Sequence, residues 1–183
     1  MVNKGVTLIE MLVAVTIFAI VVGAISSIFI SAIRTQRRVL ATQELLDQTS
    51  YVLEYMGRAL RMAKKDSNGS CITVGTNYLT NPPVNDAIQF IATTNTGDEC
   101  TAFHLVGNKI VKTIMSTGES FDLTSANLQV NSLKFNLSGE SESDTLQPRV
   151  TIFLEIEGRE AAGSRPKIQT QTSISQRPLD VAQ

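Results

Sequence analysis

The feature that most limits the fold is an uncharged run of 23 residues, 11–33, close to the N-terminus. As an α-helix, a run of this length rises about 35 Å, which is enough to cross the hydrocarbon core of a bilayer. The run is apolar on every side and not only along one stripe, so a buried core helix of a water-soluble domain is the weaker interpretation. The sequence therefore predicts a membrane-embedded helix.

The rest of the chain has the composition of a folded protein. Of 183 residues, 43% are hydrophobic and 18% are charged, which excludes a disordered or collagen-like chain. Residues 1–65 carry eight basic and four acidic side chains, whereas residues 66–183 carry eight and thirteen. With no overall cationic field and a body of net charge −5, we expect no nucleic-acid partner.

Glu10 is an acidic residue at the edge of the apolar run. A carboxylate beside a lipid-facing segment is energetically unfavourable, and such residues tend to be functional. One interpretation is that a partner neutralises Glu10. The other is that Glu10 lies in the headgroup layer, as a first-turn acid favoured by the helix dipole.

Residues 4–10, with the sequence Lys-Gly-Val-Thr-Leu-Ile-Glu, resemble the processing signature of type IV pilins and type II secretion pseudopilins. The resemblance implies that a prepilin peptidase cuts between Gly5 and Val6 and that the new amine of Val6 is methylated. The family more often has Phe or Met at the position of Val6. If Val6 becomes the terminus, its amine lies one helical turn from Glu10. A neighbouring subunit could then offer its own amine to Glu10, and this pairing would check the register of subunit addition.

The N-terminus has two other interpretations. A secretory signal peptide would end near Arg34, but no convincing Ala-x-Ala cleavage site stands there. An uncleaved signal anchor stays open, although Arg34, Arg37 and Arg38 lie on the side of the run that would be exported, which the positive-inside rule disfavours.

The helix is expected to continue beyond the apolar run. No proline precedes Pro82, and the sequence predicts one helix over residues 6–65, ended by Asp-Ser-Asn-Gly at residues 66–69. The second half is amphipathic, and packing on the chain's own body is favoured over a seam for partner helices. Its apolar positions are Val39, Leu45, Leu46, Val52, Leu53, Met56, Ala59, Leu60 and Ala63.

Period-two patterns begin after the predicted helix and indicate a β-rich head. Strands are expected at residues 72–74, 87–93, 102–106, 109–114, 128–137, 150–157 and 167–175, with Gly107-Asn108 as a two-residue hairpin turn. The predicted fold class is α+β, a long N-terminal helix packed on an antiparallel β-sheet head, which agrees with the pilin-like fold that the resemblance implies.

The expected organisation has four parts. Residues 1–5 form a prepilin leader, residues 6–33 a transmembrane and filament-core half of the helix, residues 34–65 an amphipathic half packed on the head, and residues 66–183 the head itself.

Cys71 and Cys100 are the two cysteines, and both lie in the head. A disulfide in an oxidising, extracytoplasmic compartment is the favoured interpretation, and two free cysteines are the alternative. His104 stands alone in a strand pattern without a nucleophile motif or a phosphate loop, so we expect no enzyme, no cofactor and no metal centre. A weak calcium candidate is formed by Glu140, Glu142 and Asp144, for which a solvated acidic loop is the preferred interpretation.

The sequence therefore predicts a structural subunit of a type IV pilus or type II secretion filament. The β-rich head, the absence of a proline from the apolar half and the closing strand resemble J-type minor pseudopilins or W-type minor pilins, whereas K-type tip subunits usually lack the acid that Glu10 supplies. The partners implied are the prepilin peptidase, other major and minor pilins or pseudopilins, the inner-membrane assembly platform and, before assembly, membrane lipid. A major pilin of the filament shaft and a signal-anchored envelope protein with a binding head are the alternatives.

Overall fold

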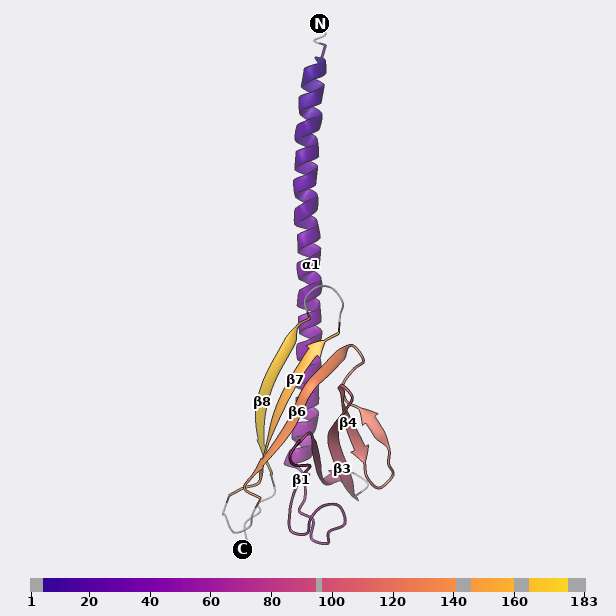
Figure 1. Cartoon of the computed structure of the whole chain (residues 1–183), viewed down its shortest axis with the longest axis vertical. Coiled ribbons are helices and arrows are strands. Elements are labelled where there is room, and N and C mark those ends of the chain that lie inside the picture. The colour runs from indigo at the N-terminus through magenta and orange to yellow at the C-terminus, as the bar shows by residue number, and fades with distance from the viewer. Residues whose placement is uncertain (1–4, 95–96, 141–145, 160–164, 178–183) are drawn as a thin grey trace. The chain divides into compact units, whose positions relative to one another are not determined.

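The computed structural model describes residues 5–94, 97–140, 146–159 and 165–177. It divides into two compact units, Met1–Leu40 and Ala41–Gln183, which are described separately below. One helix, α1 (Leu8–Arg61), contributes to both units. The long N-terminal helix and antiparallel strands of the α+β prediction are both present (Figure 1).

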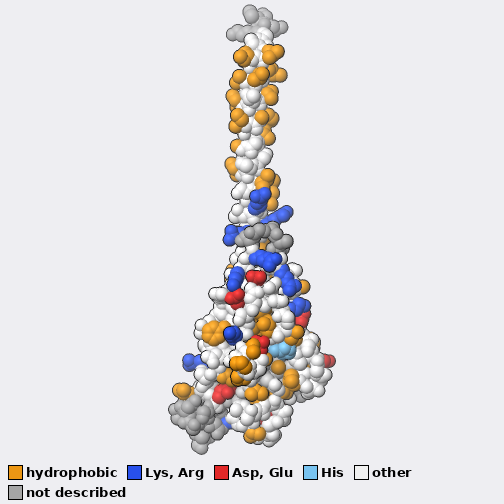
Figure 2. Space-filling model, in the orientation of Figure 1, with side chains coloured by type: hydrophobic (Ala, Val, Ile, Leu, Met, Phe, Trp, Pro, Cys, Tyr) orange, Lys and Arg blue, Asp and Glu red, His pale blue; other side chains and the backbone are white. Residues whose placement is uncertain are grey.

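The N-terminal unit consists of a single helical segment whose apolar side chains are all exposed. Figure 2 shows these side chains, in orange, around the N-terminal part of α1. Three hydroxyl groups of the apolar run donate to a carbonyl of the preceding turn: Thr16 to Val13 (2.8 Å), Ser26 to Val22 (2.8 Å) and Ser27 to Ala24 (2.8 Å). These hydroxyls therefore need no water, which suits a helix surrounded by hydrocarbon.

In the second unit, the last turns of α1 form one side of the core. The buried stripe recurs at intervals of three or four residues and consists of Leu45, Thr49, Val52, Met56, Leu60 and Ala63. The predicted packing of this half-helix on the chain's own head is confirmed. Two members of the predicted stripe do not take part, because Val39 and Leu46 are each 49% exposed.

The helix ends at Arg61, four residues before the predicted end. Its last carbonyl groups accept both from the next turn and from distant parts of the head. The Met62 N–H donates to the carbonyls of Arg58 (3.3 Å) and Ala59 (3.2 Å), and the Ala63 N–H donates to that of Leu60 (3.2 Å). The Tyr78 hydroxyl donates to the Leu60 carbonyl (2.7 Å), and the backbone N–H of Arg177 donates to the Arg61 carbonyl (2.8 Å). The Gln176 side-chain amide donates to the carbonyl of Ala63 (2.7 Å). Local and tertiary hydrogen bonds together therefore complete the end of α1.

The strands form two antiparallel sheets, where the sequence predicted one. The five-stranded sheet has the order β1-β2-β3-β4-β5, and its strands are β1 (Leu79–Thr80), β2 (Ala87–Thr94), β3 (Gly97–Val106), β4 (Lys109–Ile114) and β5 (Ser120–Asp122). The three-stranded sheet consists of β6 (Leu128–Ser138), β7 (Arg149–Gly158) and β8 (Lys167–Ser175), in that order. Figure 1 shows these three strands beside the C-terminal part of α1.

The sheets meet where β6 approaches two turns of the five-stranded sheet. The Val130 N–H donates to the Asn108 carbonyl (2.9 Å), and the Phe135 N–H donates to the Asn85 carbonyl (2.8 Å). Side chains from both sheets and from α1 share one hydrophobic core, in which Phe90, Phe103 and Phe135 are among the largest buried groups.

Most predicted strands are present, and the errors are local. The hairpin turn at Gly107 and Asn108 is confirmed, with Gly107 at φ +60° between the paired residues Val106 and Lys109. The strand predicted at residues 72–74 is wrong, because these residues belong to a loop that folds around Asp66. The short strands β1 and β5 were not predicted.

Candidate functional site

The leader junction is an extended, open segment at the start of the N-terminal unit. Val6 is 73% exposed, and a Cβ atom placed on Gly5 would meet nothing within 4 Å. The fold of the chain therefore does not require glycine at position 5. Lys4 and the residues before it lie outside the described residues.

Thr7 and Glu10 form a reciprocal cap at the N-terminus of α1. The Glu10 N–H donates to the Thr7 hydroxyl oxygen (3.3 Å), and the Thr7 N–H donates back to Glu10 Oε2 (3.2 Å). The Thr7 hydroxyl also donates to Oε2 (3.1 Å), and the Met11 N–H donates to the Thr7 carbonyl (3.2 Å). This is a capping box, in which Thr7 and Glu10 satisfy two N–H groups that the first helical turn would leave without partners.

The cap uses only one side of the Glu10 carboxylate. Both hydrogen bonds end on Oε2, so Oε1 can still accept a donor from outside the chain. Leu8, Ile9 and Met11 surround Glu10 along the helix, and all three are more than 60% exposed. A carboxylate on an exposed apolar helix can thus be held in place before any partner arrives.

The helix that carries Glu10 is long and apolar enough to cross a membrane. Among the described residues, α1 is the one helix with such a segment, and that segment contributes nothing to the buried core. Arg34 and Arg37 follow the apolar run and are exposed. This arrangement fits an apolar segment that ends in a basic collar at a headgroup layer.

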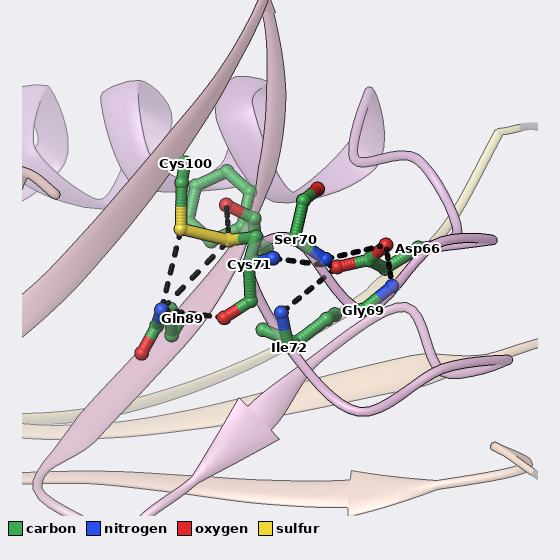
Figure 3. The surroundings of a disulfide bond; sticks show 8 residues. Asp66, Gly69, Ser70, Cys71, Ile72, Gln89 and Cys100 are labelled. Carbon is green, nitrogen blue, oxygen red and sulfur yellow. Dashed lines mark hydrogen bonds between the residues drawn. A yellow bond between two sulfur atoms is a disulfide. The ribbon is translucent and has the colours of Figure 1, made fainter. Parts of the chain in front are cut away.

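The head contains a second well-ordered polar group. Asp66 is 1% exposed and lies at the centre of a loop that follows α1 (Figure 3). Its Oδ1 accepts from the N–H groups of Asn68 (3.0 Å), Gly69 (2.7 Å) and Ser70 (3.3 Å). Its Oδ2 accepts from the N–H groups of Cys71 (2.7 Å) and Ile72 (2.9 Å).

This hydrogen bonding determines the protonation state of Asp66. The N–H groups of Ile72 and Cys71, followed by those of Asn68 and Gly69, hold the pKa of the Asp66 carboxyl far below its usual range, although burial acts in the opposite direction. Asp66 is therefore a structural anion that the loop wraps completely. The sequence placed Asp66 at the end of the helix and gave no sign of this role.

The predicted disulfide between Cys71 and Cys100 is present, with Cα atoms 5.4 Å apart. It ties the Asp66 loop to β3. The Gln89 side-chain amide adds a second tie by donating to the Cys71 carbonyl (2.8 Å), as Figure 3 shows. Neither Gln89 nor the Thr7 cap was identified from sequence, although the Thr-x-x-Glu spacing of residues 7–10 is a capping signal.

The structure describes the remaining candidates only in part. Glu140 is half-buried, and Glu142 and Asp144 lie outside the described residues. The described residues contain no group of His, Cys, Asp and Glu side chains that could hold a metal ion. His104 is half-buried in β3, where it pairs with Ala87 and Val111.

Comparison with known proteins bears on the N-terminus. The prokaryotic N-terminal methylation motif matches residues 1–26, a range that includes the leader junction, the capping box and part of the apolar helix. No curated protein and no solved structure matches the chain. The motif implies processing by a prepilin peptidase and assembly with pilins. The methylation motif, together with the long apolar helix and the antiparallel β head, supports a place for the chain in the type IV pilin and type II secretion pseudopilin family.

Proposed function

We propose that this chain is a minor pilin or pseudopilin, a low-abundance structural subunit that helps to start a type IV pilus or type II secretion filament. The prepilin peptidase removes residues 1–5 by cutting between Gly5 and Val6, and the amine of Val6 is then methylated. Residues 6–33 form the transmembrane and filament-core segment, residues 34–65 the amphipathic half of the helix and residues 66–183 the head. In the assembled filament, Glu10 accepts the amine of a neighbouring subunit.

Members of this family are structural proteins and not enzymes, and the N-terminal hydrophobic helix holds the chain in the inner membrane before assembly. A membrane-held store suits a subunit whose apolar helix must later leave lipid for a filament core. The proposed partners are the prepilin peptidase, other pilins or pseudopilins and the inner-membrane assembly platform.

One observation carries the role of Glu10. Its carboxylate is fixed by Thr7 through Oε2, and Oε1 stays available on an exposed apolar helix. Removal of the leader at Gly5 would leave a cationic amine on Val6, one residue before the cap, so the donor and acceptor of the proposed pair lie within one helical turn in each subunit. Pairing between subunits then neutralises a carboxylate that lipid or a filament core would otherwise destabilise.

The finer assignment rests on the head. The β-rich head, its closing strand and the absence of a proline from the apolar half of α1 resemble J-type pseudopilins or W-type pilins. The presence of Glu10 speaks against a K-type tip subunit. A major pilin would be abundant and would form filaments alone. A signal-anchored envelope protein would keep residues 1–5 and would tolerate replacement of Glu10.

Intact-mass spectrometry of the membrane-extracted chain tests the proposal directly. In cells with the prepilin peptidase, we expect loss of residues 1–5 and a methyl group on Val6, and in cells without the peptidase we expect the full chain. Gly5→Leu is the matched variant, because a side chain at Gly5 meets nothing in the chain's own fold. A failure of Gly5→Leu to be cleaved would therefore reflect peptidase recognition. A full-length, unmethylated chain in both strains would contradict the proposal.

A further inference from the structure

Asn68 stands directly before Gly69 in the exposed part of the Asp66 loop. Of the ten asparagines in the sequence, Asn68 alone precedes a glycine. An Asn-Gly pair is chemically labile because glycine, having no side chain, lets its backbone nitrogen reach the side-chain carbonyl carbon of asparagine. The sequence thus contains one site at which spontaneous deamidation is expected to be fast in an open chain.

The reaction needs the Gly69 nitrogen in a free, deprotonated state. That nitrogen attacks Cγ of Asn68, a new N–Cγ bond forms, the Cγ–Nδ2 bond breaks and ammonia leaves. The resulting succinimide is opened by water to give Asp or isoaspartate at position 68. No oxidant or reductant takes part, and water is the only co-reactant.

In the folded loop the Gly69 nitrogen is not free. Its N–H donates to Asp66 Oδ1 at 2.7 Å, one of the two shortest contacts that this buried carboxylate makes. Figure 3 shows Gly69 pointing its N–H toward Asp66 from the same turn that supplies Ser70 and Cys71. A carboxylate opposes removal of the proton that it accepts and opposes negative charge on the nitrogen behind it.

The reactive Asn68-Gly69 pair cannot be removed by replacing Gly69 without changing the loop. Gly69 has φ +71°, and a Cβ atom placed there would lie 2.8 Å from Val74 Cγ2. Both the backbone conformation and the space therefore require glycine at position 69. The residue that allows the loop to close around Asp66 is the same residue that makes Asn68 reactive when the loop is open.

We propose that Asn68 is a site of spontaneous deamidation. In the folded loop the hydrogen bond from Gly69 to Asp66 prevents the reaction, and the reaction proceeds whenever the loop opens. The inference concerns the head alone and does not depend on the proposed function. The N–H groups of residues 68–70 all donate to Asp66 Oδ1. Isoaspartate at position 68 adds a methylene to the backbone of this run, so the three N–H groups can no longer converge on Oδ1 and the loop stays open. The new carboxylate also lies close in sequence to that of Asp66, with the same charge.

The test follows deamidation of the full chain in detergent micelles, aged at physiological temperature and mildly alkaline pH. Peptide-level mass spectrometry reads Asn, Asp and isoaspartate at position 68, and Asn108, which precedes Lys109, is the internal control. In urea, Asn68 is expected to deamidate much faster than Asn108. In the folded, oxidised chain, Asn68 is expected to deamidate at least about tenfold more slowly than in urea. Equal rates in the folded and denatured chains would overturn the proposal.

A second measurement assigns the protection to the Gly69 hydrogen bond. Hydrogen exchange of the Gly69 amide in the wild-type chain should be slowed by the same factor as deamidation, within about threefold, because one loop opening releases both. Asp66→Asn should accelerate deamidation toward the denatured rate. A Gly69 amide that exchanges freely while Asn68 stays protected would overturn the proposal. So would wild-type protection in a folded Asp66→Asn chain. Since Asp66→Asn can prevent folding, the wild-type comparison is the decisive one.

Discussion

Glu10 and Asp66 are both acids that accept backbone N–H groups, and they differ in how completely they are used. Asp66 is buried, and its two oxygens accept five N–H groups of one loop. Glu10 is exposed and accepts from one N–H and one hydroxyl, both at Oε2. An acid whose two oxygens accept hydrogen bonds only from its own chain stabilises the fold. An acid with one oxygen that its own chain does not use can accept a donor from another subunit.

The largest expected effect is on assembly. Glu10→Ala and Glu10→Gln should each lower incorporation into filaments at least about tenfold, because neither side chain can neutralise a neighbour's amine. The thermal midpoint of the head should not change. Immunoblotting of sheared filaments measures incorporation, with Asp47→Asn as the control for an exposed acid on the same helix. Normal assembly of Glu10→Ala would show that Glu10 does not bind a neighbouring subunit, and it would contradict the proposed contrast with Asp66.

The second prediction concerns Asp66. Asp66→Ala should lower the thermal midpoint of the full chain in detergent by about 15 °C or prevent folding, because the five N–H groups lose their common acceptor. Asp66→Asn, which keeps one carbonyl oxygen, should lie between Asp66→Ala and wild type. Calorimetry or near-UV circular dichroism measures the change. A midpoint within about 2 °C of wild type for Asp66→Ala would show that the loop does not depend on this anion.

The disulfide should matter slightly less. Cys71 and Cys100 close a segment with a sequence separation of 29, for which chain entropy predicts about 3.5 kcal/mol of stabilisation. The double variant Cys71→Ser, Cys100→Ser should therefore unfold about 10 °C lower than the oxidised wild type. Reduced wild type should match the double variant. Reduced wild type as stable as the oxidised form would mean that Asp66 alone holds the loop.

Acid should weaken the part of the fold that depends on the Asp66 carboxylate. The pKa of Asp66 is lowered in the folded chain, so its contribution is fully present above its unfolded pKa, near 4, and is lost as the pH falls through the folded value. Below about pH 4, wild type should therefore lose stability more steeply than Asp66→Asn. Thermal midpoints measured across the acid range test this. Parallel curves for the two proteins would contradict the linkage.

The smallest effect is expected at Thr7. Thr7→Ala removes the capping hydroxyl, whose contribution is about 1 kcal/mol, and should lower filament incorporation by about fivefold or less. Thr7→Ser keeps the hydroxyl and should assemble normally. If Thr7→Ala were as severe as Glu10→Ala, Thr7 would have a role beyond holding the carboxylate.

Much of the fold could be predicted because its signals are local. The apolar run, the stripe from Leu45 to Leu60 and the Gly107 turn are periodic or conformational features of short segments. The end of α1 could not be predicted, because Tyr78 and Arg177, which donate to the carbonyls of Leu60 and Arg61, come from far along the chain. The division into two sheets likewise depends on where β6 meets Asn85 and Asn108.

The candidate site also has residues with local sequence signals and residues whose roles depend on the folded loop. Gly5, Val6 and Glu10 could be proposed from the sequence because the motif that contains them is contiguous. Asp66 was interpreted only as part of a helix stop, since nothing in its neighbourhood indicates that five successive amides will turn toward one side chain. The Ile72 to Val74 strand was predicted wrongly for the same reason: β-branched residues there serve a loop whose shape the anion determines.

The bonds at the end of α1 also have a mechanical consequence. Tension entering the head through the last turns of α1 passes at Arg61 and Ala63 into residues 176 and 177, directly after β8. β8 is in turn paired with β7 along nine residue pairs. We therefore expect tension on the helix to be distributed over the three-stranded sheet, so that residues do not separate from the head one after another.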